Sequence, residues 1–246
     1  METIHAMLYH TNPEYSISIL AIVMLALGFL GYHFMGSWLM NHWGHGKNKA
    51  HPSFFMAHLL RRILGFALMG VFPLVVFYYL FELHPQEYGI NLKQAGRSVM
   101  WILVFLPPII ALNYYVAGKP SNLQQYPQIR LVQWDLKDLF INFFNWMLYL
   151  WGYEMLFRGF LLFAFYHAFG VPMAITVNVV VYALVHIPKG LREVAGSVPF
   201  GVALCLITLS TGSFLAAFVL HTLMALSNEF FAIRFHPEMR IKSLKL

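Results

Sequence analysis

Long apolar runs make up most of this sequence, and their length indicates whether the protein folds in water or in a membrane. A membrane span needs about 20 predominantly apolar residues. We identify seven such runs, at residues 15–40, 63–83, 98–117, 139–168, 171–188, 195–210 and 213–233. Hydrophobic residues make up 59% of the 246 positions and charged residues 11%, a balance that excludes an ordinary soluble domain. The sequence therefore predicts an all-α fold, a polytopic transmembrane helical bundle of about seven spans.

Basic residues are distributed unevenly between alternate connections of this bundle. Lys93 and Arg97 share the side of the N-terminus, and thirteen basic residues share the other side: Lys47, Lys49, Arg61, Arg62, Lys119, Arg130, Lys137, Lys189, Arg192, Arg234, Arg240, Lys242 and Lys245. The positive-inside rule then places the N-terminus outside and the C-terminus in the cytoplasm. The formal charge of +6 reflects this topology and anionic lipid headgroups. Since no nucleic-acid-binding motif is present, we expect no nucleic acid partner.

Two ionisable residues lie in the middle of the fourth apolar run. Glu154 and Arg158 are the only charged residues between Asp138 and Lys189, and they stand four apart in WGYEMLFRGFLLFAF. Four-residue spacing puts both on one face of a helix, where they can form an ion pair. Charged residues inside a membrane face the bundle interior and often mark a functional site. A pair that only fixes helix packing is the alternative explanation.

Further polar residues occur in later spans. His186 ends the fifth span and His221 lies inside the seventh, with Asn228 seven residues further on and on nearly the same helix face. A carboxylate beside histidines can act as a general base towards water. Two histidines and a glutamate also match a catalytic zinc site in residue type, but the H-E-x-x-H spacing is absent. We therefore predict neither a metal nor another cofactor.

These motifs resemble the CPBP family, the Abi-type intramembrane proteases that include CAAX prenyl proteases and bacteriocin-processing enzymes. The family motif EExxxRG is matched by YEMLFRG at 153–159, and FxxxH by YALVH at 182–186. The last motif histidine is matched in HTLMA at 221–225, after the lead-in STGSFLAAFVLH. The order and spacing of these motifs agree with the family over about residues 146–233.

The resemblance implies a bundle that encloses a polar cavity in which a glutamate activates water. Four residues occupy family motif positions: Glu154, Arg158, His186 and His221. Two positions depart from the pattern, because Tyr153 replaces the glutamate that the family uses as base, and Ala225 replaces a polar residue. Adjacent helical residues point about 100° apart, so Glu154 does not stand where a side chain at position 153 would. Loss of a general base typically costs about 10²–10⁴ in rate.

Two functional hypotheses follow. In the first, the chain is a catalytically degenerate CPBP-family membrane protein that acts as a binding or assembly subunit of a membrane complex. In the second, it is an active intramembrane endopeptidase that cleaves a membrane-tethered peptide of CAAX or bacteriocin type, with Glu154 as base and Asn228 in place of the missing polar residue. A transporter or channel is supported by the buried charges alone. The expected partners are the lipid bilayer and either other membrane subunits or such a peptide.

The chain divides into three expected parts in a bacterial cytoplasmic membrane. Residues 1–137 would hold three packing spans, 138–233 the CPBP-like core, and 234–246 a basic cytoplasmic tail. We expect no charge deep inside the first three spans and no removable signal peptide. The loop at 40–52, with His42, His45 and His51, is expected to lie at the headgroups.

Overall fold

The computed structural model describes residues 13–43 and 52–242. The long helices are α2 (Pro13–Trp43), α3 (Pro52–Phe66), α4 (Phe72–Phe81), α5 (Ala95–Ala117), α7 (Leu136–Glu154), α8 (Leu162–Leu184), α9 (Leu191–Thr211) and α10 (Leu215–Phe235). Two π-helical turns are η1 (Ala67–Val71) and η3 (Met155–Leu161). The shorter elements are η2 (Pro85–Tyr88), α6 (Pro120–Leu123), η4 (Ile187–Lys189), β1 (Gln133–Trp134) and β2 (Arg240–Ile241). The predicted all-α bundle is confirmed.

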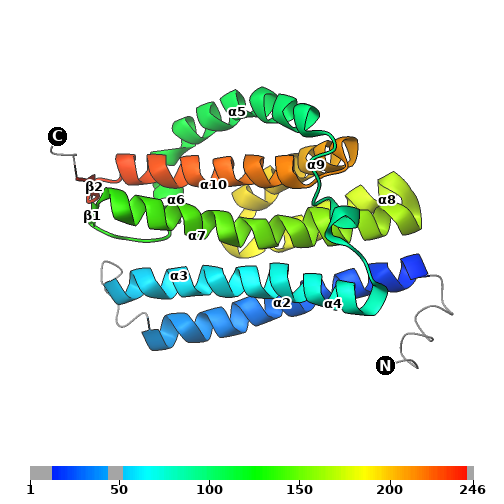
Figure 1. The fold of residues 1–246 in the computed structure, drawn as a ribbon. Coiled ribbons are helices and arrows are strands. Elements are labelled where there is room, and N and C mark those ends of the chain that lie inside the picture. Colours follow the sequence, from blue (N-terminus) through cyan, green and yellow to red (C-terminus); the bar gives the residue numbers. More distant parts are fainter. Residues whose placement is uncertain (1–12, 44–51, 243–246) are drawn as a thin grey trace.

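The helices form a layered bundle around α7 (Figure 1). α2 packs against α3, and α3 packs against α7. On the other side α10 lies along α7, and α5 covers α10 as the outermost helix (Figure 1). α8 packs against α9 and α2. This arrangement puts α7 and η3, which carry Glu154 and Arg158, in the middle of the molecule.

Among the described residues, six helical stretches are long and apolar enough to cross a membrane. The count differs from the predicted seven because the fourth and fifth predicted spans belong to one stretch, Leu136–Leu184, of 49 residues. Such a helix would measure about 73 Å if straight, more than twice the thickness of a bilayer core. Gly170 interrupts it with φ 78° and ψ 178°, and the second part folds back so that Asn178 bonds Phe157. The break therefore falls between the two predicted spans.

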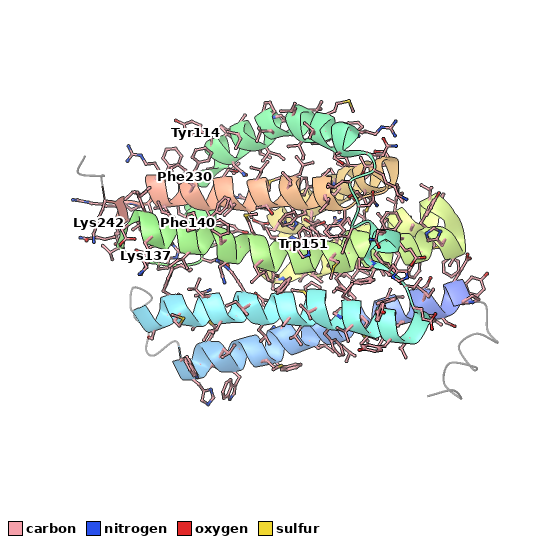
Figure 2. All side chains as sticks on the ribbon, in the orientation of Figure 1. Tyr114, Lys137, Phe140, Trp151, Phe230 and Lys242 are labelled. Atoms are coloured by element: carbon pink, nitrogen blue, oxygen red, sulfur yellow. The ribbon has the colours of Figure 1, made fainter. Side chains whose placement is uncertain are left out.

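One end of the bundle holds the two short strands, and we call it the strand end. β1 and β2 pair in parallel, with Trp134 opposite Ile241. Figure 2 shows Lys137 and Lys242 at this end, with the exposed rings of Tyr114, Phe140 and Phe230 nearby. Exposed aromatic rings beside basic residues are typical of a membrane–water interface. The strand end is thus one boundary of the membrane-embedded region.

The π-helical turn η1 occurs just before Pro73, a residue that disrupts α-helical hydrogen bonding. Pro73 lacks an N–H to donate to the preceding turn and crowds the carbonyl four residues before it. η1 widens the chain just ahead of Pro73, and Phe72 N–H bonds the Ala67 carbonyl five residues back. Gly70 of η1 meets Gly152 of α7, where an added Cβ on Gly70 would lie 3.0 Å from the Gly152 Cα. This close crossing fixes α7 against the first helices of the chain.

Arg62 lies just ahead of the second expected span, 63–83, and is a buried charge. Its side chain is 2% exposed inside α3 and donates to Asn142 Oδ1 at 2.7 Å and to Gln128 Oε1 at 3.1 Å. The guanidinium carbon lies 4.0 Å from the centre of the Trp146 ring. Glu229 of α10 is buried in the same cluster and attracts Arg62 electrostatically. The amide oxygens and the indole face replace the hydration that the guanidinium loses on burial.

We expect Arg62→Met to lower the free energy of unfolding by about 1.5–3 kcal/mol, the worth of hydrogen bonds to a charged group. The substitution keeps the apolar stem but leaves the oxygens of Asn142 and Gln128 without their donor. Thermal unfolding in detergent micelles measures the loss. Arg61→Met is the neighbouring control, because the Arg61 guanidinium stacks on Tyr32 instead. Equal losses in the two variants would contradict a specific role for Arg62.

Candidate functional site

The buried ion pair predicted from the sequence is present at the junction of α7 and η3. Arg158 Nη1 lies 3.2 Å from Glu154 Oε1, and both side chains are 0% exposed. α7 begins where Asp135 caps it by accepting from the Asp138 N–H at 2.8 Å, in a reciprocal capping box. Glu154 is therefore the last residue of a helix whose start is fixed by its own sequence.

His221 of α10 joins this pair from the opposite helix. Its Nδ1 lies 2.5 Å from Oε1 of Glu154, the same oxygen that faces Arg158. When Glu154 is ionised its oxygen accepts, so Nδ1 of His221 carries the proton and donates. The His221 side chain is 13% exposed, which makes it the most open member of the group. We call Glu154, Arg158 and His221 the ionic joint, because they connect α7, η3 and α10.

Aromatic rings surround the ionic joint. The Arg158 guanidinium carbon lies 4.2 Å from the centre of the Tyr182 ring, a cation–π contact. The Tyr153 ring stacks on Phe157 at 4.7 Å and meets Phe29 of α2 edge-on at 5.7 Å. Tyr153 thus packs between α7 and α2 as a core side chain. Its hydroxyl is buried, with no hydrogen-bond partner in the described part of the chain.

His186 lies beside the joint without a direct bond to Glu154. Its Nδ1 is 2.7 Å from the Tyr182 carbonyl. Because a carbonyl oxygen only accepts, Nδ1 donates and Nε2 remains an acceptor. Burial, with a smaller effect from the charge of Lys189, lowers the pKa of His186 to about 3. The imidazole is therefore neutral at physiological pH.

The lowered pKa of His186 predicts a pH dependence of stability. The folded protein binds this proton less tightly than the unfolded chain, whose histidine has the ordinary pKa of 6.5. The stabilising contribution is thus fully present above about pH 6.5, and we expect it to fall by up to about 1.4 kcal/mol per pH unit below that value. Thermal unfolding of the parent and of His186→Gln between about pH 5 and 6.5 measures it. The variant should show a shallower slope, and parallel curves would contradict this assignment.

Asn228 does not reach the ionic joint. Its amide faces Asn122 of α6, and the two side chains exchange hydrogen bonds at 3.1 and 3.3 Å. Ala225 packs against the main hydrophobic core at the place where the family has a polar residue. The structure therefore brings Glu154, Arg158 and His221 into contact, places His186 beside them, and directs Asn228 elsewhere.

Comparison with known families gives one match. Residues 135–227 match the family model of type II CAAX prenyl endopeptidase Rce1-like proteins. This range begins at the cap of α7 and ends inside α10, so it contains the whole ionic joint and His186. The matched range is 93 of the 246 residues, and the match is consistent with membership of the CPBP family. No curated protein and no solved structure matches it.

The match to this membrane-protease family and the six apolar helices of the described residues support an integral, multi-pass membrane protein. The glycine of its RG motif has a clear packing role. A Cβ on Gly159 would lie 3.0 Å from the Tyr88 carbonyl oxygen, and the Tyr88 ring packs against Phe160 of η3 at 4.4 Å between ring centres. Gly159 thus lets the connection between α4 and α5 close over the CPBP core.

Part of the polar interior was not predicted from the sequence. Glu229 is buried beside Arg62. The rule that singled out Glu154, an acidic residue inside an apolar span, could have found it. Asn178 is also buried, and its amide donates to the backbone of η3.

The described residues contain no cluster of three or more His, Cys, Asp or Glu side chains arranged to hold a metal ion. Of the histidines in the loop at 40–52, His42 lies in the last turn of α2, with its Nδ1 3.0 Å from the Trp38 carbonyl oxygen. His45 and His51 lie outside the described residues.

Proposed function

We propose that the chain is a catalytically degenerate CPBP-family protein that acts as a binding or assembly subunit of a membrane complex. The observation that carries this proposal is the place of Tyr153. The position that the family gives to its base holds a ring packed between Phe157 and Phe29. A tyrosine side chain in water has a pKa near 10, so the neutral hydroxyl is a poor base at neutral pH.

The remaining carboxylate supports the same function. Oε1 of Glu154 is bonded by both Arg158 and His221, and the three side chains connect separate elements. In this role the ionic joint holds α7, η3 and α10 in one arrangement, and the lipid-facing helices present a fixed surface to partners. Buried charge networks that specify one helix arrangement are known in other proteins.

The experiment is gentle extraction from native membranes, followed by sizing and mass spectrometry of the bound proteins. We expect a fixed set of membrane-protein partners at constant ratio. A cleavage assay in proteoliposomes with membrane-tethered peptides, including CAAX-terminated ones, runs beside it and should show no product. Recovery as a lone species, or cleavage that Glu154→Gln abolishes, would overturn the proposal.

An active endopeptidase is the second candidate, and one observation favours it. Oε2 of Glu154 is buried and accepts no hydrogen bond from the described residues. A carboxylate oxygen of this kind can accept a proton from a water molecule, with His221 and His186 nearby to orient that water. The cleavage assay above separates the two functions.

We further propose a bacterial cytoplasmic membrane, with the N-terminus outside and the strand end in the cytoplasm. Lys137 and Lys242 at the strand end, and the excess of basic residues in the connections of that side, support this orientation. Reporter fusions at each terminus, one active only in the cytoplasm and one only outside it, test it. A cytoplasmic signal from the N-terminal fusion would contradict it.

A further inference from the structure

A buried amide outside the family motifs holds the π-helical turn of the site. Asn178 of α8 is fully buried, and its Nδ2 donates to the Phe157 carbonyl oxygen at 2.7 Å. The same oxygen accepts the Leu162 N–H, which is the five-residue hydrogen bond of a π turn. Turns of this kind often lie at functional sites. Asn178 therefore adds a second bond to a carbonyl that already maintains the widened turn.

A thiol from a third helix orients the Asn178 amide. Cys205 of α9 is buried, and its Sγ lies 3.3 Å from Asn178 Oδ1, so the thiol donates and the amide oxygen accepts. This bond fixes which end of the amide faces η3, because Nδ2 must then point to Phe157. The three groups form a chain from α9 through α8 to η3.

Arg158 is the residue that the hydrogen bonds from Cys205 through Asn178 to Phe157 position. It follows Phe157 directly, so the place of the Phe157 peptide sets where the Arg158 side chain starts. Tyr182 lies four residues after Asn178, on the same face of α8, and its ring supports the guanidinium at 4.2 Å. One face of α8 thus bonds the backbone of the π turn and covers the cation that the turn presents to Glu154.

We propose that Asn178, oriented by Cys205, is a positioning residue that sets Arg158 against Glu154 and thereby fixes the Glu154–His221 contact. The inference goes beyond the proposed function, since it concerns the geometry of the ionic joint. Detection of peptide cleavage would overturn the proposed function and leave this inference intact. Spectra of the joint test it independently of any partner.

The first readout is the infrared S–H stretching band. The sequence contains one cysteine, so the band in purified, reconstituted protein belongs to Cys205 alone. We expect a hydrogen-bonded S–H band in the parent and a shift to the frequency of a free thiol in Asn178→Leu. Asn178→Asp retains an acceptor and should keep the thiol bonded while losing the donor to Phe157.

The second readout is the nitrogen NMR signal of His221 in histidine-labelled protein, assigned by its loss in His221→Gln. We expect Asn178→Leu and Asn178→Asp to shift the Nδ1 signal, and Cys205→Ala to shift it less. Asn145→Leu is the matched control. Asn145 is buried and donates to the Leu59 carbonyl at 3.1 Å, away from η3, so its loss should weaken the bundle without moving the His221 signal.

The outcomes separate positioning from packing. A His221 shift in the Asn178 variants but not in Asn145→Leu supports the inference. An unchanged His221 signal in Asn178→Asp and Cys205→Ala, or an equal shift in Asn145→Leu, would overturn it. If Asn178→Leu does not fold, the near-isosteric Asn178→Asp and Cys205→Ala still decide the question.

Discussion

Replacing Arg158 by methionine is expected to lower the free energy of unfolding by about 3–5 kcal/mol, the usual loss when one partner of a buried ion pair is removed. Glu154 would remain fully buried beside His221 without the guanidinium that faces it at 3.2 Å. Methionine keeps the volume and flexibility of the stem, so the effect comes from the charge. Thermal or denaturant unfolding in micelles measures it.

A double substitution distinguishes the pair from general packing. Glu154→Gln removes the charge that Arg158 would leave behind, and its amide can still bond His221. The double variant Glu154→Gln with Arg158→Met should therefore be more stable than Arg158→Met alone, which is the coupling that a double-mutant cycle reports. Arg234→Met, at an exposed basic residue on α10, should change stability by less than about 0.5 kcal/mol. Additive losses for Glu154 and Arg158 would contradict a coupled pair.

Restoring the family glutamate by Tyr153→Glu is expected to destabilise the bundle without producing cleavage. The substitution removes a buried ring from its contacts with Phe157 and Phe29, and loss of a large buried aromatic side chain costs about 3–5 kcal/mol. The new carboxylate would also face aromatic rings that cannot replace its hydration.

Tyr153→Phe is the matched control for this substitution. It keeps the ring and removes a hydroxyl that has no hydrogen-bond partner within the described residues, so its effect should stay within about 1 kcal/mol. Unfolding experiments compare the two variants, and the proteoliposome cleavage assay is run on both. A stable Tyr153→Glu protein that cleaves a tethered peptide would show that position 153 still faces a working catalytic site.

The motif residues could be predicted because each obeys a local rule. Charged residues in apolar spans must face the interior, which identified Glu154 and Arg158, and the four-residue spacing predicted their contact. The family motifs suggested that His221 lies in the same site as Glu154. The departures at Tyr153 and Ala225 were also visible in the sequence, but whether Tyr153 packs or faces a cavity depends on neighbours such as Phe29, which are distant in the chain.

Helical periodicity predicts which residues share a helix face, but it does not predict which neighbouring element each of them contacts. Asn228 shares a helix face with His221 within about one-tenth of a turn, yet it bonds Asn122 because α6 lies beside that part of α10. From the sequence, Arg62 was counted only with the basic residues of the connections. Its burial depends on Asn142, Gln128 and Trp146, which come from later in the chain.

The sequence by itself determined that this protein is a helical membrane bundle with a CPBP-type set of polar residues, because hydrophobic length and motif spacing are local properties. The tertiary structure decided which of those residues meet. Helix crossings such as Gly70 against Gly152, and the π turn that Asn178 holds, set the register between helices to within an ångström or so. The hydrogen bonds of a buried carboxylate depend on relative helix positions as precise as this. The sequence of one helix does not specify those positions.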